Sequence, residues 1–454
     1  MKQTIYALST PAGTSGVAVI RASGAQAFDG LAQLTGKPAD YFKPRRTYLR
    51  RLYHLDDQSL IDQAMVIAFK GPESFTGEDV VEYHIHGGLA VRNLMLEMLS
   101  RIEGHRMADP GEFSRRAFQN DKMDLIEAEG VSDLIHAETA AQHKQALTQL
   151  EGKLSAVYID WAERLKNMLA YMEADIDFAE DEELEDTAFS KMRDKLAALS
   201  AEIKHHLDDN RRGERLREGL QVVIVGAPNA GKSSLLNALA QRDIAIVSQM
   251  AGTTRDIIET HLDLGGYPVI LADTAGLRPE QLDASDTDGH DMVESEGIRR
   301  AIERAHKADI KLLMFNGTEM PDLDLNTLQL ASADDLFIVN KIDLYDGVVP
   351  SIADQQPICI SVKRAEGIDR LLKRLTERIE KIFGRTEAPT ITRARHREAL
   401  IEAESSIDRA LNIDLPELAA EDMRLAMRAL GRITGRVDVE DLLDVIFHDF
   451  CIGK

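Results

Sequence analysis

The stretch GAPNAGKS, residues 226–233, decides how the middle of this 454-residue chain folds. It follows the apolar run LQVVIV at 220–225, typical of a buried strand, and precedes the helical run SLLNALAQ at 234–241. Between residues 220 and 381, strand-type and helix-type runs alternate. That alternation predicts a doubly wound parallel sheet, and a strand before GAPNAGKS with a helix after it is the context that a phosphate-binding P-loop requires.

Four residues of this stretch carry the predicted chemistry. Gly226 and Gly231 let the backbone wrap around phosphates, so that successive N–H groups at the start of the helix point at the anion. Lys232 is placed to reach the terminal phosphates, and the Ser233 hydroxyl is a ligand for Mg²⁺. The stretch therefore predicts a site for a nucleoside triphosphate with magnesium.

Two further motifs complete the phosphate side of the site. The stretch AGTTRD at 251–256 lies at the spacing of a switch segment, and Thr254 is its candidate second hydroxyl on Mg²⁺. The run ILADTAG ends a predicted strand at Asp273, a carboxylate placed to hold the ion through water. The same run puts Gly276 near the terminal phosphate.

Two motifs predict that the base is guanine. VNKID supplies Asn340, Lys341 and Asp343, and SVK at 361–363 follows the next strand and is expected to close over the base. The Asp343 carboxylate can accept hydrogen bonds from the ring and exocyclic N–H groups of guanine, whereas adenine offers no such pair of donors. GTP is therefore predicted over ATP.

One position departs from the pattern of Ras-type GTPases. Where a glutamine usually orients the attacking water, this chain carries Leu277, which can neither position water nor donate a hydrogen bond. Arg255 is the one candidate for an arginine finger in the switch segment. The catalytic help is therefore expected from elsewhere.

The bulk composition narrows the functional classes. A formal net charge of −23 gives the surface no general attraction for nucleic acid, so any RNA contact must use a local basic patch or a partner's surface. Two cysteines, Cys359 and Cys451, exclude a disulfide framework, and no run approaches a signal peptide or a membrane span. The ending CIGK fits the prenylation pattern poorly. A cytoplasmic protein without membrane contact is predicted.

Changes of pattern along the chain predict four segments. Residues 1–119 mix strand and helix signals, whereas residues 120–217 and 382–454 show helical periodicity. The strand–helix alternation occupies residues 218–381. This order predicts a multidomain α/β protein in which a Ras-like P-loop GTPase domain is inserted into an all-α helical domain.

Seven stretches together carry a resemblance to a known family. They run from one end of the chain to the other: GVAVIRASG, FTGEDVVEYHIHGG, PGEFSRRAFQNDKMDLIEAEGVSDLI, GAPNAGKSSLLNAL, IVSQMAGTTRD, DTAGLR and the terminal FCIGK. With these stretches the sequence resembles the MnmE family, also called TrmE, of bacterial GTPases that modify the wobble uridine of tRNA. Other P-loop GTPases lack the N-terminal and C-terminal stretches.

The resemblance implies a layout and an activity. Residues 1–119 are expected to bind tetrahydrofolate and to make a homodimer. Family members work with the flavoprotein MnmG in a heterotetramer or larger complex. Together they add an aminomethyl or carboxymethylaminomethyl group to C5 of the wobble uridine of certain tRNAs. The implied one-carbon source is 5-formyltetrahydrofolate or a related reduced folate.

The resemblance also implies how the missing glutamine is replaced. Family members are activated by K⁺ when their G domains dimerise, and oxygen ligands at matching positions here come from Asn229, Ser248, Thr253 and the main chain of Met250. The family's water-orienting glutamate aligns with Glu294. Glu296 and Glu280 are alternatives, because the stretch after DTAGLR is longer here than in the relatives compared.

The motifs and the resemblance together define a set of GTP-binding residues, of which Ser233 and Thr254 are the Mg²⁺ ligands. The set takes in the P-loop, the switch segment, the DTAG motif and the two base-recognition motifs: Asn229, Ala230, Gly231, Lys232, Ser233, Ser234, Ser248, Gly252, Thr253, Thr254, Asp273, Thr274, Ala275, Gly276, Asn340, Lys341, Asp343, Ser361, Val362 and Lys363.

The folate site implied by the resemblance joins distant stretches. Arg21, Glu82, Lys122 and Lys454 match family ligand positions. Cationic groups suit a glutamyl carboxylate, and a carboxylate can pair with the amino and ring N–H groups of a pterin. The resemblance also puts Cys451 in this site, where its thiol is a candidate to meet the transferred one-carbon unit; packing of a small buried thiol is the alternative.

Two other functions stay open on the sequence alone. One is a ribosome-assembly GTPase that binds RNA without modifying it, although no GXXG loop of a KH module follows the GTPase segment. The other is a GTP-driven scaffold whose folate domain is vestigial. The basic stretches at 211–217 and 385–397 are candidates for tRNA contact or for solvated helix ends.

Overall fold

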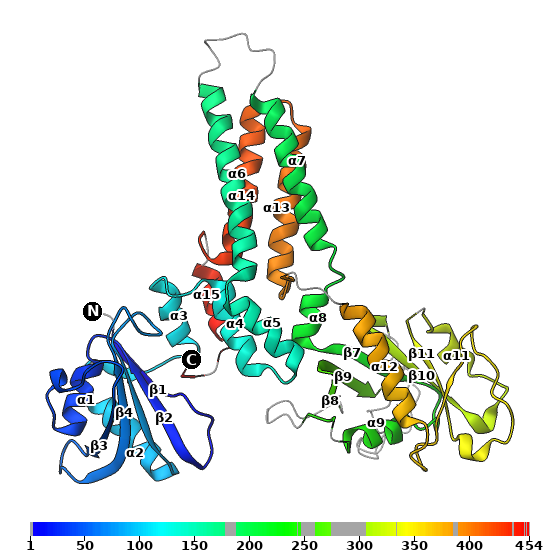
Figure 1. Ribbon diagram of the computed structural model, residues 1–454, viewed down its shortest axis with the longest axis horizontal. Helices are drawn as coiled ribbons and strands as arrows, with labels where there is room; N and C mark the ends of the chain where they lie inside the picture. The colour runs from blue at the N-terminus through cyan, green and yellow to red at the C-terminus, as the bar shows by residue number, and fades with distance from the viewer. Residues whose placement is uncertain are drawn as a thin grey trace, which may run out of the picture. The chain divides into compact units, whose positions relative to one another are not determined.

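The computed structural model describes most of the chain. The described residues are 3–177, 188–242, 244–246, 259–273, 306–332, 334–384, 389–437, 440–448, 450 and 452–453. The chain divides into two compact units, each of which is discontinuous in sequence. Unit 1 comprises Met1–Ser132, Gln149–Ile203 and Glu398–Lys454, and unit 2 comprises Asp133–Thr148 and Lys204–Arg397. Figure 1 labels their helices and strands.

Unit 1 contains a six-stranded sheet in the order β3-β4-β5-β2-β1-β6, in which only the β1–β6 pair is parallel. Its strands are β1 (Thr4–Leu8), β2 (Ser15–Ser23), β3 (Thr47–Tyr53), β4 (Leu60–Phe69), β5 (Val80–Gly87) and β6 (His105–Met107). Helices α1 (Ala27–Thr35) and α2 (Leu89–Arg101) accompany it, with a short 3₁₀ helix, η1 (Ala39–Tyr41), before β3.

Alternation along β2 and β5 gives this sheet two different faces. Ile20 on β2 and Tyr83 on β5 are fully buried in the core that α1 and α2 cover. Arg21 and Glu82, one position along, therefore lie on the opposite face, and they are direct partners in the antiparallel register. The sheet thus juxtaposes two charged residues that lie 61 positions apart in sequence.

The helices outside the sheets come from three parts of the chain. They are α3 (Glu112–Gln119), α4 (Leu125–His136), α5 (Ala140–Leu150), α6 (Lys153–Asp177), α7 (Ala188–Leu207), α13 (Ala394–Asn412), α14 (Pro416–Thr434) and α15 (Glu440–His448). α6 and α14 run side by side in unit 1 (Figure 1). On α6, Leu165, Leu169 and Met172 recur at helical spacing and are buried, which agrees with the helical periodicity of residues 120–217.

Unit 2 contains a second six-stranded sheet, in the order β12-β11-β10-β7-β9-β8, in which only β8 is antiparallel. Its strands are β7 (Leu220–Val225), β8 (Glu259–Leu264), β9 (Tyr267–Asp273), β10 (Ile310–Asn316), β11 (Leu336–Asn340) and β12 (Ile358–Cys359). The helical elements are α8 (Arg212–Glu218), α9 (Lys232–Ala240), α11 (Leu325–Gln329), α12 (Ile368–Phe383), η3 (Gly317–Glu319) and η4 (Ile342–Leu344).

Both faces of the second sheet are buried, which explains the unbroken apolar run of its strands. Val222 and Ile224 of β7 pack with α9 and α12, whereas Val223 and Val225 belong to a separate core on the other face. The doubly wound sheet predicted from the alternation is confirmed. With it, the multidomain α/β class is confirmed.

The four predicted segments, 1–119, 120–217, 218–381 and 382–454, remain a prediction. The two compact units group the chain differently, because α4, α5, α7 and α13 each contribute residues to both. Across the part of the chain that the structure describes, no helix combines the length and apolar character needed to cross a bilayer.

Candidate functional site

The P-loop lies between β7 and α9 and takes the conformation that its sequence predicts. Asn229 has a φ of +67° and Gly231, the N-cap of α9, has a φ of +104°. A side chain at Gly231 would also collide with the amide nitrogen of Asn340. Glycine is therefore required there both by the positive φ and by the lack of space for a Cβ. The loop thereby presents the N-terminus of α9, whose first N–H groups have no partners within the helix.

Lys232 folds back over this loop. Its ammonium group donates to the carbonyl oxygens of Gly226 at 2.8 Å and Ala227 at 3.1 Å. Ser233 and Ser234 follow in the first turn of α9 and are exposed. The P-loop therefore offers backbone N–H groups, an ammonium group and a hydroxyl within one turn, which suits a phosphate chain with a hard cation.

Asn340 ties three of the predicted motifs together. Its side-chain amide donates to the carbonyl oxygen of Ala230 at 2.8 Å, and its side-chain oxygen accepts from the N–H of Val362 at 3.2 Å. The residue is only 3% exposed, so water cannot replace either bond. The P-loop and the SVK motif are thus held at fixed positions by one amide at the end of β11.

Asp343 is held in the ionised form beside this amide. The hydroxyl of Ser361, which is fully buried, hydrogen-bonds to the carboxylate and lowers the pKa of Asp343. The Arg364 guanidinium lies 3.8 Å from the same carboxylate, whose side chain is 6% exposed. An oriented, charged acceptor therefore lies three residues after the amide that bonds the P-loop.

The β8–β9 hairpin links the two predicted switch regions. β8 begins at Glu259, three residues after the AGTTRD stretch, and β9 ends at Asp273, the first residue of the DTAG motif. At the hairpin turn the carbonyl oxygen of Gly266 accepts from the N–H of Ala141 at 3.0 Å. On β8 the ring of His261 lies 3.2 Å from the Glu138 carboxylate.

Residues at the start of α5 thus bond to the β8–β9 hairpin. The start of α5 and the hairpin both belong to unit 2. A third bond supports the contact, because the Gln142 amide donates to the carbonyl oxygen of Arg217 at 3.0 Å. A cavity of about 170 Å³ lies beside it, lined among others by His136, Glu138 and His261. We call this set of contacts, Glu138 with His261 and Ala141 with Gly266, the hairpin clamp.

Eleven predicted site residues lie outside the described residues: Ser248, Met250, Gly252, Thr253, Thr254, Thr274, Ala275, Gly276, Glu294, Cys451 and Lys454. Asp273 is described as the last residue of β9, but its side chain is not. Of the predicted GTP-binding set, the structure brings together the P-loop residues 229–234, Asn340, Asp343, Ser361 and Val362. Lys341 and Lys363 lie in the same two motifs.

Two of the predicted folate residues of unit 1, Arg21 and Glu82, are bonded to each other. Glu82 accepts from Arg21 at 2.9 Å and 3.0 Å, and the Arg21 guanidinium lies over the rings of Phe75 at 5.5 Å and Phe113 at 5.8 Å. His84 approaches the second oxygen of Glu82 at 3.5 Å. This cluster offers paired charges on a half-buried aromatic floor, which suits a flat, polar heterocycle.

The Lys122 side chain lies against Gly77, two residues after Phe75. Among the described residues it makes no hydrogen bond or ion pair with Arg21 or Glu82. It lines a cavity of about 570 Å³ at the end of α14, together with Phe118, Met123 and Arg436.

The end of the chain returns to the sheet of unit 1. The Ser9 hydroxyl donates to the carbonyl oxygen of Gly453 at 3.2 Å, and Gly453, with a φ of +99°, packs so closely on Leu8 that a Cβ would collide with its carbonyl oxygen. Ala7, next to Leu8, is the register partner of Arg21. Gly453 therefore lies beside β1, and β1 pairs with β2, the strand that carries Arg21.

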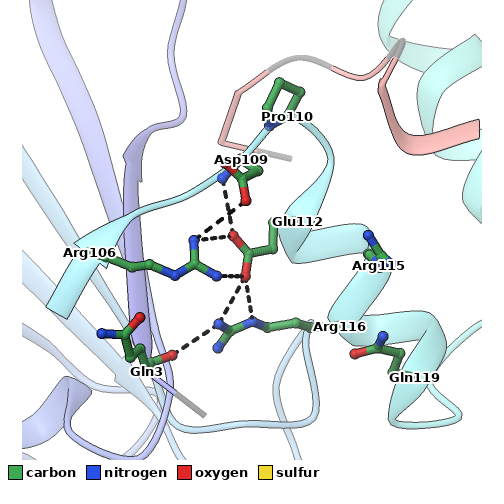
Figure 2. A pocket seen from close by; sticks show the side chains of 8 residues that line it. All are labelled: Gln3, Arg106, Asp109, Pro110, Glu112, Arg115, Arg116 and Gln119. Atoms are coloured by element: carbon green, nitrogen blue, oxygen red, sulfur yellow. Dashed lines mark hydrogen bonds and ion pairs between the residues drawn. The ribbon is translucent and has the colours of Figure 1, made fainter. Parts of the chain in front are cut away.

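An arginine–carboxylate network that the sequence reasoning missed holds α3 in place. Figure 2 shows the Glu112 carboxylate between the guanidinium groups of Arg106 and Arg116. Burial works against its charge, yet hydrogen bonds from Arg106, from the Asp109 N–H and from Arg116 lower the pKa of Glu112. Arg116 is itself buried and reaches Glu78 at 2.9 Å. The only signal in the sequence was the four-residue spacing of Glu112 and Arg116.

This network also bounds a cavity of about 280 Å³, lined by Gln3, Arg106, Asp109, Pro110, Glu112, Arg115, Arg116 and Gln119 (Figure 2). The carboxylates and guanidinium groups of the network largely satisfy one another's hydrogen bonds and charges. The network therefore holds α3 in position, and with it Phe113, the ring below Arg21.

Comparison with known proteins gives a consistent family match. The family model described as GTP-binding protein TrmE N-terminus matches residues 4–122, and the model described as MnmE helical domain matches residues 125–451. The chain is 50% identical over 459 residues to tRNA modification GTPase MnmE of Paramagnetospirillum magneticum, and 51% identical over 459 residues to that of Parvibaculum lavamentivorans. The protein of the same name from Rickettsia akari is 46% identical over 456 residues. In each case 100% of both chains is covered.

Solved structures show weaker likenesses. The G domain of the FeoB iron transporter of T. maritima is 21% identical with a TM-score of 0.26, and covers 35% of this chain and 98% of that one. A variant of the GTPase Era from Aquifex aeolicus, bound to GDP and aluminium fluoride, is 27% identical with a TM-score of 0.25, and covers 43% and 69%. TM-scores this low support no conclusion about the chain.

Replacing Asn340 by alanine tests whether its amide holds the site together. The change leaves the Ala230 carbonyl and the Val362 N–H buried without partners, so we expect the free energy of unfolding to fall by about 2–4 kcal/mol in denaturant titrations without nucleotide. Asn316, its register partner on β10, is the matched control. Among the described residues its side chain bonds the nearby Thr318 and Glu319 alone, so alanine there should cost about 1 kcal/mol. Equal losses in the two variants would contradict the bridging role.

Proposed function

The chain belongs to the MnmE family of tRNA modification GTPases, and on that premise we propose that it is a potassium-activated GTPase that works with the flavoprotein MnmG. Together they add an aminomethyl or carboxymethylaminomethyl group to C5 of the wobble uridine of certain tRNAs, with a reduced folate as the one-carbon source. The family membership makes the chain a GTP hydrolase that acts in tRNA modification and uses GTP with Mg²⁺. The main support for GTP binding at the predicted motifs is the pair of hydrogen bonds made by Asn340. They join the P-loop, which is predicted to bind phosphate, to the SVK motif, which is predicted to bind the base.

The described side chains support a division of labour in the GTP site. The N-terminus of α9 and the Lys232 ammonium bind the phosphates, and the Ser233 hydroxyl is a ligand for Mg²⁺. Asp343, kept charged by Ser361, accepts from the two N–H groups of guanine. Mg²⁺, when bound, neutralises charge that develops on the phosphate oxygens.

Potassium activation is proposed for the P-loop apex. Asn229 is exposed there in a left-handed conformation, so its amide oxygen is available to a cation beside the phosphates. Ser248, Thr253 and the main chain of Met250 are the other proposed ligands, and Glu294 is proposed to orient the attacking water in place of the absent glutamine. A GTP turnover rate that is equal in potassium and sodium would remove this part of the proposal.

A folate site is proposed at the Arg21–Glu82 cluster. The Glu82 carboxylate suits the amino and ring N–H groups of a pterin, and the rings of Phe75 and Phe113 give it an apolar floor. The position of Gly453 beside β1 supports a contribution from the chain's end, with Lys454 as a ligand and Cys451 facing the one-carbon unit. Lys122 is proposed to take the glutamyl carboxylate. If 5-formyltetrahydrofolate fails to bind the wild-type protein in calorimetry, this site is wrong.

A homodimer is proposed through the sheet of unit 1. Leu49 and Met65 are register partners, and both are exposed on the face away from α1 and α2. Val17 on β2 is exposed in the same way. An apolar, solvent-facing sheet surface of this kind is typical of a protein interface. Light scattering gives the mass of the full chain in solution, and a monomer at micromolar concentration would exclude this dimer.

Analysis of tRNA nucleosides tests the function as a whole. A strain that lacks the gene should lose the C5 modification of the wobble uridine, and the wild-type chain supplied in trans should restore it. Unchanged modification in the deletion strain would defeat the proposal.

Two variants separate the role of GTP turnover from the role of the thiol in the modification. Glu294→Ala should lose potassium-stimulated GTP turnover by about 10²-fold or more while GTP affinity is unchanged, because the water is no longer oriented. Cys451→Ser should keep the turnover but lose the modification. Full modification with Cys451→Ser would leave the thiol a packing role.

The hairpin clamp is proposed to couple GTP hydrolysis to the modification. Both switch regions are covalently continuous with the β8–β9 hairpin, and the hairpin is bonded to the first turn of α5, a helix that continues to Leu150 in unit 1. A displacement of the switches can therefore act on α5 through two named contacts. The coupling is conformational and needs no direct contact between nucleotide and tRNA.

Glu138→Gln should weaken this coupling without impairing hydrolysis. The Glu138–His261 pair is about one-third exposed on both sides, so its loss is worth up to about 1 kcal/mol, or roughly a two- to fivefold fall in modified uridine per GTP hydrolysed. Glu151→Gln, which removes an exposed charge from the same part of the chain, is the control. His261→Ala should give a similar fall, and the double variant should be no worse than either single one. Unchanged ratios in both single variants would reject the clamp as the route.

A further inference from the structure

A short segment of unit 1 reverses the charge of the rest of the chain. Residues 37–51, KPADYFKPRRTYLRR, contain six lysine and arginine residues and one acidic residue, in a protein of net charge −23. The segment covers η1 and most of β3, and β3 is the outermost strand of its sheet. Its backbone edge therefore faces away from the other strands.

The aromatic residues of the segment build a fixed platform. Phe42 is buried, and it packs edge-to-face against Tyr41 at 5.2 Å and Tyr48 at 5.4 Å between ring centroids. The Arg50 guanidinium lies over the Tyr41 ring at 4.8 Å and the Tyr48 ring at 5.3 Å, and it donates to the Tyr41 hydroxyl. Arg50 and Tyr41 are therefore held in place, while Tyr41 remains 41% exposed.

The cations around this platform are available to a ligand. Lys43 and Arg46 are exposed, and among the described residues neither side chain has an acidic partner. Arg45 pairs with Glu73 at 3.2 Å, but both side chains are largely exposed, at 62% and 76%, so the pair is weak and easily exchanged. Asp40, the one acid of the segment, is exposed too.

The other basic stretches of the chain are different, because acids within the fold neutralise them. In the stretch at 211–217, Arg211 pairs with Glu214 and Arg215 pairs with Asp309. In the described part of the stretch at 385–397, Arg397 bonds both Asp209 and Glu214 at 2.7 Å and 3.0 Å. These side chains serve the packing of unit 2 and are not offered to a polyanion. Both stretches stay sequence-based candidates for tRNA contact, but these acid-paired side chains are less available to RNA than the cations of residues 37–51.

We propose that Tyr41, Lys43, Arg45, Arg46 and Arg50, here called the basic edge, bind the tRNA substrate: the cations contact backbone phosphates and the Tyr41 ring stacks on an unpaired base. The inference rests on the proposed function only in taking tRNA as the substrate. Because the net charge of −23 gives the surface no general attraction for RNA, such a local patch also determines where the RNA is bound. An exposed ring beside a stacked guanidinium favours RNA over an acidic protein, whose carboxylates make no use of a π-face.

The double variant Lys43→Ala with Arg46→Ala tests the phosphate contacts. Binding of a tRNA transcript with an unmodified wobble uridine to the full-length protein should weaken about tenfold or more near physiological salt. The slope of log affinity against log salt should fall by about one for each lost phosphate contact. The matched control is Arg370→Ala with Lys373→Ala, two exposed cations on α12 of unit 2. It removes the same charge and should leave both quantities close to those of the wild type.

Tyr41 separates stacking from charge. Tyr41→Ala should weaken tRNA binding about tenfold, whereas Tyr41→Phe, which keeps the ring, should bind nearly as well as the wild type. GTP turnover and thermal unfolding of all variants verify that the fold is intact, since none of these residues belongs to the nucleotide site.

Three results would overturn the inference: a wild-type protein that binds no tRNA transcript, a double variant that binds like its α12 control, or a double variant that changes only the oligomeric state in light scattering. The last would make the basic edge a protein interface. Failure of the proposed function would look different, because the deletion strain would then keep its wobble-uridine modification whatever the binding data show.

Discussion

The side-chain amide of Asn340 is the contact on which the proposed nucleotide site depends. It joins the carbonyl oxygen of Ala230 in the P-loop to the N–H of Val362 in the SVK motif, and it is buried where the carboxyl ends of β11 and its neighbours meet. Without it, the phosphate-binding loop and the base-recognition loops would be separate pieces of a sheet edge. The requirement for Gly231 follows from the same side chain, because its amide nitrogen occupies the space that any Cβ at residue 231 would need.

Two sites in different units follow the same physical logic. In unit 2, a charged acceptor, Asp343, is oriented by a buried hydroxyl. In unit 1, Arg21 and Glu82 are oriented by sheet register and by the rings of Phe75 and Phe113. Both sites use a rigid sheet to fix a polar group that is expensive to desolvate. The hairpin clamp then bonds the β8–β9 hairpin of unit 2 to the start of α5, a helix that continues to Leu150 in unit 1.

Local patterns were enough to predict part of this structure. The apolar run 220–225 and the glycines of the P-loop predicted the strand, the loop and the start of α9, because each depends on neighbours in sequence. The register that pairs Arg21 with Glu82, and the bridge made by Asn340, depend on strands far apart in the chain, so no spacing could reveal them. Resemblance supplied the residues of the proposed folate site, and the structure adds the rings of Phe75 and Phe113 below Arg21. The sequence run KPRRTYLRR already shows that the basic edge is rich in cations. Only the structure shows that cations in the other basic stretches are paired with acidic residues of the same fold.

The most direct test of the link between the GTP site and the modification is a change of nucleotide specificity. In Asp343→Asn, the amide offers one acceptor and one donor, which no longer match the two N–H donors of guanine but do match the N–H and carbonyl of xanthine. Modification of the wobble uridine by the purified system with Asp343→Asn should then run with xanthosine triphosphate and fail with GTP. Modification that still proceeds with GTP as in the wild type, or that proceeds without either nucleotide, would contradict the claim that GTP bound at this site drives the reaction.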